Sequence, residues 1–310
     1  MSDEPSKTRL FAYAQVGYFG FGHSLLAWAR CRLWCNRHGV PMLAPNWLHI
    51  RGRIGPIRRR EHDNRQYHRL FHFPNYITGW RWCYLLLTAR RVAAETTDID
   101  ALLRRGESAL VVFKNLVLYN EEAHFQEIVG HGAALRQDLL VMTKPKYLPE
   151  AFDTPHIALH VRMGDFNVVP SLAAVRQGAK NSRIPIEWYC RMLAALREQL
   201  GPVPARLYSD GTDEALQPLL DMADVVRPTK QPSISDLLAI SQAHLVISSG
   251  SGFSSWGAYF ANAPRICFPG QRFTRVLGPC AQLDLEPECE HATDLKPEFI
   301  EHVRALLAAR

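Results

Sequence analysis

The chain has 310 residues, of which 47% are hydrophobic and 21% charged, and its formal net charge is +6. This composition excludes a disordered chain, and the length predicts two domains of roughly 150 residues each. Residues 1–9 are polar and unlike a secretory signal, and the seven cysteines are scattered without a paired framework. We therefore expect a cytoplasmic protein with free thiols.

The first half of the chain opens with a strand, a helix and a second strand. Residues 17–22 form a glycine-rich turn between the first two, and Gly39 is a stop signal for the helix. Such a βαβ opening is typical of a parallel sheet covered by helices. The predicted elements of this half are strands at 9–16, 40–44 and 109–118 and helices at 23–38 and 124–140.

Nearly all the net charge lies in residues 47–95, which contain ten arginines against three carboxylates. A basic surface of this kind suits an anionic membrane face, a pyrophosphate-linked glycan or nucleic acid, or is simply solvated. Nucleic acid is the less favoured partner, because no RNA-binding module pattern accompanies the arginines and aromatic residues at 51–82. The apolar stretch at 80–94 is interrupted by arginines and is shorter than the about 18 apolar residues that a membrane span needs, so we do not expect a transmembrane helix. Any membrane contact would then be peripheral, at the inner face of the membrane.

The second half alternates strands and helices regularly, which predicts a doubly wound sheet. A Pro- and Lys-containing linker at 144–155 precedes it, so we place the domains at 1–150 and 151–310. The predicted strands are at 156–161, 205–208, 225, 245–248 and 265–268, and the predicted helices are at 186–200, 213–222, 233–243, 254–261 and 297–309.

Polar side chains follow two of these strands, where ligands of open α/β sheets bind. The first segment is His160-Val-Arg162-Met163-Gly-Asp165, in which Arg162 suits phosphate oxygens, with a surface pair to Asp165 as the alternative. In the second segment, Ser209-Asp210-Gly211, the carboxylate suits a ribose hydroxyl or a guanine edge. Taken alone, this segment favours an Asp210 that caps the following helix.

A third strand ends in small hydroxyl and glycine residues, from Ser248 to Ser255, and a helix follows. Free backbone N–H groups and the positive end of a helix then face the same space, which suits a diphosphate. A structural Ser/Gly loop is the alternative.

In order and spacing across residues 155–268, these segments resemble the sugar-nucleotide half of the α-1,2-fucosyltransferases of glycosyltransferase family 11 and of their α-1,6 and protein O-fucosyltransferase relatives. Those families show an H-x-R-R-G-D-like, an S-D-D-like and an S-x-S-x-F-S-W-W-G-A-Y-like segment. Met163 stands here where the second Arg is usual and Gly211 where the second Asp is usual. The first half matches weakly, through Gly20-Phe-Gly22-His23 in place of G-L-G-N.

The resemblance implies an α/β protein of the GT-B fold, with two Rossmann-like domains and a cleft between them. It implies an inverting, metal-independent transfer, most simply of fucose from GDP-fucose, to a hydroxyl of a glycan or lipid-linked oligosaccharide acceptor. No cofactor is expected, and another nucleotide sugar is the alternative donor. The second domain would bind the donor, and the first would lie on the acceptor side.

The resemblance also assigns residues. Arg162 would hold the β-phosphate and stabilise the leaving group, and Asp165 is the positional candidate for the general base, with Glu61, His62 and Asp63 as alternatives. The expected nucleotide-binding residues are His160, Arg162, Asp210, Ser251, Phe253, Ser254, Ser255 and Gly22. On the acceptor side we expect the basic residues 51–69 together with Trp47, Tyr67, Trp80 and Trp82.

Two metal-like patterns have simpler interpretations. Cys31, Cys35 and His38 share one helix among apolar neighbours, which favours buried packing over zinc. Asp98-Ile-Asp100 is formally a D-x-D motif, but its place before an Ala-Leu-Leu run favours helix capping. No metal site is therefore expected.

Overall fold

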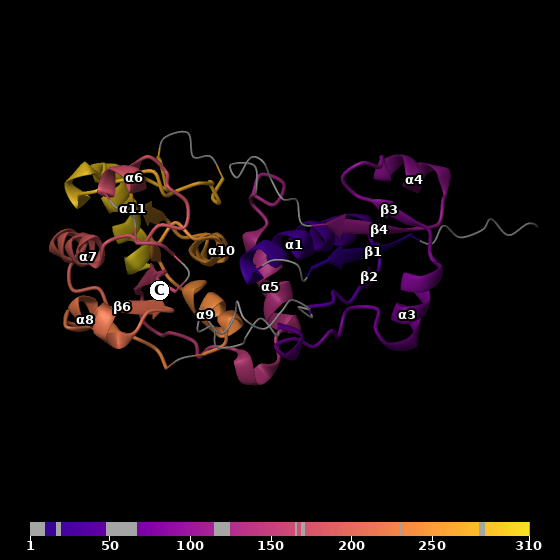
Figure 1. Ribbon diagram of the computed structural model, residues 1–310, viewed down its shortest axis with the longest axis horizontal. Coiled ribbons are helices and arrows are strands. Elements are labelled where there is room, and N and C mark those ends of the chain that lie inside the picture. The colour runs from indigo at the N-terminus through magenta and orange to yellow at the C-terminus, as the bar shows by residue number, and fades with distance from the viewer. Residues whose placement is uncertain are drawn as a thin grey trace, which may run out of the picture. The chain divides into compact units, whose positions relative to one another are not determined.

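The computed structural model describes residues 10–16, 20–47, 67–114, 125–164, 166–168, 171–229, 231–278 and 283–309. These residues fold as two compact α/β units, each built on a parallel sheet (Figure 1). The first unit takes the described residues within 10–47, 67–114 and 141–144, and the second takes those within 125–140 and 145–309.

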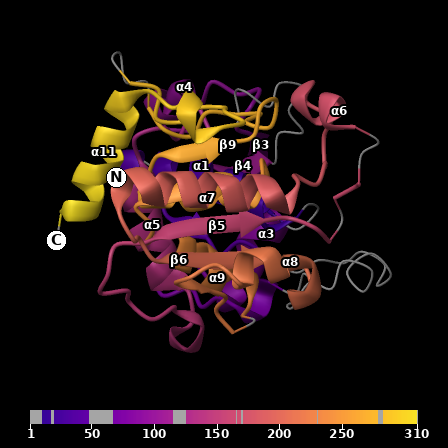
Figure 2. The ribbon, with the colours of Figure 1, turned by 90° about the vertical axis from the view of Figure 1, so that its left-hand side faces the viewer.

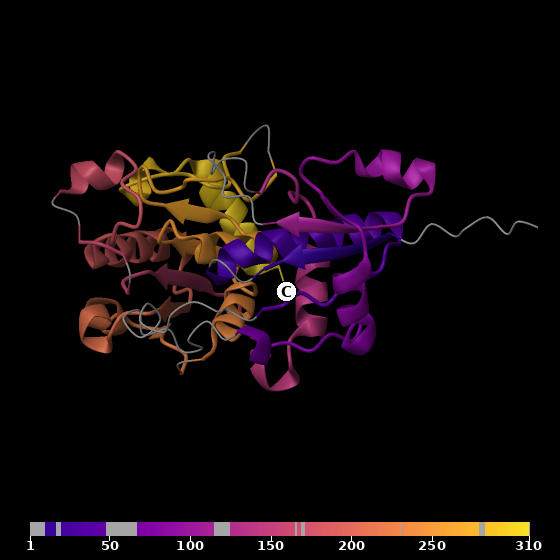
Figure 3. The ribbon, with the colours of Figure 1, turned by 45° about the vertical axis from the view of Figure 1, so that its right-hand side comes forward.

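The first sheet has the strand order β2-β1-β4-β3, and its central strands lie side by side in Figure 3. β1 (Leu10–Gln15) pairs in parallel with β4 (Ala109–Lys114) along its whole length. Both are nearly continuous apolar runs, as expected of strands covered on both faces. The outer strands are β2 (Met42–Leu43) and β3 (Arg91–Ala93).

Helices cover this sheet. α1 (Phe21–His38) buries Leu25, Trp28 and Cys31 and contacts β1, β2 and β4. α3 (Gly79–Thr88) contributes Leu85 to a cluster with Phe11 of β1. The other helical segments among the described residues of this unit are α4 (Ile99–Arg105) and a 3₁₀ turn at Tyr67–Arg69.

The second sheet has the order β7-β6-β5-β8-β9, with every pair parallel. Numbered within this unit, the order is 3-2-1-4-5, which is the doubly wound arrangement predicted from the sequence. The order reverses between β5 and β8. The strands are β5 (Ile157–Val161), β6 (Ala205–Ser209), β7 (Val225–Val226), β8 (Leu245–Ser248) and β9 (Arg265–Cys267).

Helices lie on both faces of this sheet (Figures 1 and 2). α7 (Ile186–Leu200), α8 (Asp213–Leu220) and α11 (Pro297–Ala308) share one core with the inward side chains of β5, among them Leu159. α9 (Ser233–Ile240) and α10 (Gly252–Ala261) lie together on the other face, and α10 packs on β8. Among the described residues, the other helical segments are α5 (Gly132–Met142), whose last two residues belong to the first unit, α6 (Leu172–Arg176) and 3₁₀ turns at Pro145–Tyr147 and Ala292–Asp294.

The sequence prediction needs correction or completion at several elements, since α1 begins two residues early, at Phe21, and neither β3 nor α6 was predicted. The helix predicted at 124–140 is wrong at its start, because Gly130 adopts φ +82° and residues 125–130 form turns, so that α5 begins at Gly132. α10 begins at Gly252, two residues before the predicted start. α3 was not predicted at all. Within the described residues, no helix is both long and apolar enough to cross a membrane.

Candidate functional site

Three strand ends meet at the reversal point of the second sheet. β5 lies between β6 and β8, and all three strands run parallel, so their carboxyl ends share one edge. His160 and Arg162 come from the end of β5, Asp210 follows β6, and the Ser/Gly loop follows β8. The crevice outside such a reversal point is where doubly wound sheets bind ligands. The sequence motifs are therefore brought together here.

Arg162 is held in place by Asp210. The guanidinium Nη1 lies 2.8 Å from Asp210 Oδ2. The backbone N–H groups of Met163 and Gly164 donate to Asp210 Oδ1 and Oδ2 at 2.7 and 2.9 Å. One carboxylate thus receives three donors, which orients the arginine and fixes the turn after β5.

The interpretation of Asp210 as a helix cap is wrong. Thr212 caps α8 instead, because its side-chain oxygen accepts from the N–H of Ala215 at 3.3 Å. The carboxylate of Asp210 bonds to Arg162 and to the backbone of the turn at 163–164. Its structural role is to position Arg162.

Two further arginines support the site, and neither was predicted from the sequence. Arg183 Nε donates to the carbonyls of Met163 and Phe166, each at 2.8 Å, and so closes the turn after β5. Arg227 Nη2 donates to the carbonyls of Ser209 and Gly211 at 2.9 and 2.8 Å. Neither lies in a motif, so no local signal distinguishes them from other surface arginines.

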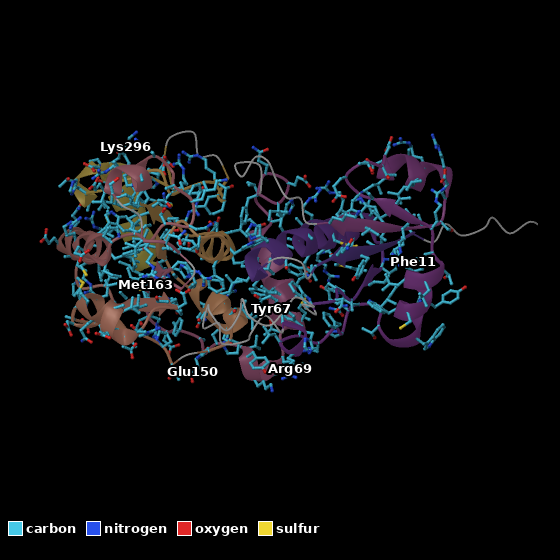
Figure 4. The ribbon with its side chains drawn as sticks, in the orientation of Figure 1. Phe11, Tyr67, Arg69, Glu150, Met163 and Lys296 are labelled. Carbon is cyan, nitrogen blue, oxygen red and sulfur yellow. The ribbon has the colours of Figure 1, made fainter. Side chains whose placement is uncertain are left out.

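Two of the departures from the family pattern, Met163 and Gly211, lie next to each other. A Cβ added to Gly211 would lie 2.5 Å from Met163 Sδ. The thioether of Met163, which Figure 4 labels, occupies the space in which a side chain at position 211 would begin. The chain therefore has an apolar contact at the two positions where the family pattern has Arg and Asp.

The N-terminus of α10 opens toward the same strand edge. Ser251 is its N-cap, with Oγ accepting from Ser254 N at 3.3 Å and its carbonyl accepting from Ser255 N at 3.1 Å. The N–H groups of Gly252 and Phe253 are then the ones that the first turn leaves for an outside acceptor. Gly252 is exposed, and a Cβ there would meet no atom within 4 Å. This end of the helix suits an anion.

His160 links β5 to this loop. Its Nδ1 lies 2.8 Å from Ser249 Oγ, and its ring stacks on that of Phe253 with centroids 5.3 Å apart. Burial, and to a smaller extent the positive charge of Arg162, lower the pKa of His160 to about 4. The imidazole is therefore neutral near pH 7 and contributes hydrogen bonding and packing rather than charge.

Ser254 and Ser255 are buried and brace the helix. Ser254 Oγ lies 2.8 Å from Ser248 Oγ and donates to the carbonyl of Ser251 at 2.9 Å. Ser255 Oγ accepts from Arg265 Nη1 at 2.6 Å. Both hydroxyls bond within the fold, so the outward groups of this loop are its backbone N–H groups.

A fully buried ion pair stabilises the contacts at the start of α10. Arg265 Nη2 lies 2.7 Å from Glu286 Oε1, and neither side chain reaches solvent. Glu286 also accepts from the N–H groups of Val276 and Leu277. The pair thus ties β9 and the segment after it to the first turn of α10.

The other predicted site residues lie elsewhere. Gly22 is the second residue of α1, in the first unit, and is partly exposed. Asp165 lies outside the described residues, as do Glu61, His62 and Asp63.

The metal-like patterns have the structures that packing and capping predict. Cys31 and Cys35 are free, buried thiols of α1, and burial raises the pKa of Cys31. Asp98 caps α4, with Oδ1 accepting from Ala101 N at 2.8 Å. Within the described part of the chain, no group of three or more His, Cys, Asp or Glu side chains could hold a metal ion.

The first unit contains a cavity of ≈ 260 Å³ beside the start of α3. Trp47 and Trp82, two of the four aromatic residues expected on the acceptor side, line it together with Asn46 and His68. Trp82 Nε1 donates to the carbonyl of Ala44 at 2.8 Å, which fixes the indole in the wall. Of the predicted basic segment at 51–69, only residues 67–69 are described.

No protein-family profile and no curated protein matches this sequence. Among solved structures, the chain is similar to the α-1,6-fucosyltransferase NodZ soaked with GDP-fucose, with 15% identity, a TM-score of 0.45, and 83% of this chain and 94% of that chain covered. The fucosyltransferase NodZ from Bradyrhizobium is 14% identical with a TM-score of 0.45, over 86% and 97% of the two chains. POFUT1 in its apo form is 9% identical with a TM-score of 0.41, over 86% and 99%.

Proposed function

We propose that this protein is a glycosyltransferase that binds GDP-fucose at the carboxyl ends of β5, β6 and β8. The proposal rests mainly on the geometry of the site. Arg162, held by Asp210, and the N-terminus of α10 both lie at the reversal point of a doubly wound sheet. The three motif segments, in the order seen in family 11 and its relatives, support fucose as the sugar.

In this proposal the reaction is a single displacement with inversion. The acceptor hydroxyl oxygen attacks C1 of the sugar, the bond from C1 to the β-phosphate oxygen breaks, and GDP leaves from the opposite face. The acceptor proton passes to a general base, for which Asp165 is our candidate. Arg162 and the N–H groups that open α10 stabilise the charge that develops on the diphosphate.

The acceptor side is assigned to the first domain, residues 1–150, and the donor side to residues 151–310, as in a GT-B enzyme. The cavity beside the start of α3 supports this assignment, because it is lined by the half-buried Trp82, and aromatic faces pack well against sugar rings. The acceptor is proposed to be a glycan or a lipid-linked oligosaccharide.

We expect GDP to bind the protein and UDP to bind much more weakly, since the resemblance of the three motif segments implies a guanine nucleotide as the donor. Isothermal titration calorimetry with each nucleotide measures both dissociation constants. Arg162→Ala should weaken GDP binding, because the diphosphate loses a charged donor. Equal affinity for the two nucleotides would contradict the guanine assignment.

We expect transfer activity to persist in excess chelator. The developing charge is assigned to Arg162 and to α10, which do the work that a metal ion does in other transferases. A radiolabelled sugar-transfer assay with and without EDTA tests this. Activity that is lost in chelator and restored by manganese would return Asp98 and Asp100 to consideration as ligands.

A further inference from the structure

α3 is apolar on both of its long faces. On the inner face, Leu85 is buried, and Trp82 and Leu86 pack against the same core as Phe11 of the first sheet. On the outer face, Trp80 is 80%, Tyr84 58% and Leu87 84% exposed. A helix on the surface of a soluble protein normally has a polar outer face, so this side of α3 is unusual.

The three exposed side chains form one stripe. Positions 80, 84 and 87 are spaced four and three residues apart, which places them on one side of a helix. Among the described residues, eight large hydrophobic side chains are exposed, and three of them are here. Scattered exposed apolar residues need no explanation, but a contiguous apolar stripe marks an interaction surface.

The flanks of the stripe are basic. Residues 67–94 carry four arginines and no Asp or Glu. Arg81 follows Trp80 and lies over the ring of Phe11, 5.7 Å from its centroid, while Arg91 donates to the carbonyl of Leu86 just after the helix. Within the described residues neither guanidinium forms an ion pair with a carboxylate, whereas Arg90 pairs with Glu107 at 2.7 Å.

We propose that the outer face of α3 docks on the surface of an anionic lipid bilayer. Trp80, Tyr84 and Leu87 enter the boundary between headgroups and acyl chains, and the exposed residues Arg81 and Arg91 flank the stripe and attract the lipid phosphates. Large amphipathic rings and flanking arginines are the side chains that favour this boundary. This inference goes beyond the proposed transfer reaction and does not depend on it.

A second copy of the chain suits this face less well. In a two-fold dimer the same surface meets itself, and both ends of the stripe carry arginine. Pairing the helices in either direction would then place like charges opposite each other, which is unfavourable. An anionic lipid surface supplies the complementary charge instead.

Sedimentation of the full-length protein with lipid vesicles tests the proposal. We expect binding to vesicles of equal parts phosphatidylglycerol and phosphatidylcholine and little binding to phosphatidylcholine alone. Replacing Trp80, Tyr84 and Leu87 together with Ser should lower the partition coefficient on the order of 100-fold, since the apolar anchor is lost. Arg81→Gln and Arg91→Gln should each lower it about fivefold, with the effect fading at high salt.

A matched variant in the second unit, Val226→Ser with Leu172→Ser, removes exposed apolar side chains that are not part of α3 and should leave vesicle binding unchanged. Circular dichroism of each variant establishes that it is folded. Absence of binding to anionic vesicles, or equal loss in the matched variant, overturns the proposal. A dimer interface would be indicated instead if the wild type does not bind vesicles and light scattering shows a dimeric wild type but a monomeric triple-Ser variant. That outcome also overturns the proposal.

Discussion

Replacing Arg162 with alanine should lower kcat by at least about 100-fold, the scale of losing one preorganised donor to a developing charge. The guanidinium is oriented before any ligand binds, because Asp210 and the turn at 163–164 hold it. Such preorganisation stabilises the transition state at no cost of rearrangement. Steady-state transfer kinetics with a GDP-sugar measure the effect, and the melting temperature should change little.

Two variants separate the role of Arg162 from a general loss of positive charge. Arg162→Lys keeps the charge but loses the planar pair of donors, so it should retain only part of the rate. Arg304→Ala removes an exposed arginine of α11, which donates to the carbonyl of Gln199, and should have normal kcat. A near-normal kcat for Arg162→Ala would remove this residue from the active site.

Replacing Arg265 with methionine should lower the free energy of unfolding by about 3–5 kcal/mol, the usual cost of breaking a buried ion pair. Glu286 would keep its charge in the core with only the N–H groups of Val276 and Leu277 as partners. Ser255 would also lose its bond from Arg265, so the start of α10 would loosen. Urea unfolding followed by circular dichroism measures the loss, and nucleotide binding should weaken with it.

Arg275 provides the control, since it pairs with Asp284 at 2.7 Å on the surface of the same region. Exposed ion pairs contribute about 0–1 kcal/mol, so Arg275→Met should change stability little. Adding Glu286→Gln to Arg265→Met should recover part of the loss, because no uncompensated charge is then buried. If Arg265→Met and Arg275→Met cost the same, burial of the Arg265–Glu286 pair is not what stabilises this region.

The strands and helices of the second unit were predictable because their signals are local. Each strand is a short apolar run bounded by turn residues, and α7 and β8 have the predicted bounds. α3 was missed because the apolar run at 80–94 was considered only as a membrane span, although it is long enough for a helix of ten residues. The start of α5 was misplaced because Gly130 breaks an otherwise helical pattern.

That His160, Arg162 and Asp210 follow strands could be predicted from local patterns, and residues after the strands of an open α/β sheet are candidates for ligand binding. Their roles depend on contacts between residues far apart in the chain. Asp210 is 47 residues from Met163 along the chain, and it reaches Arg162 because β6 pairs beside β5. Likewise, the bond from Arg265 to Ser255 depends on β9 lying next to β8. Hydrogen-bonding patterns within an element depend on neighbouring residues, whereas partners of polar side chains depend on strand order, which no local pattern specifies.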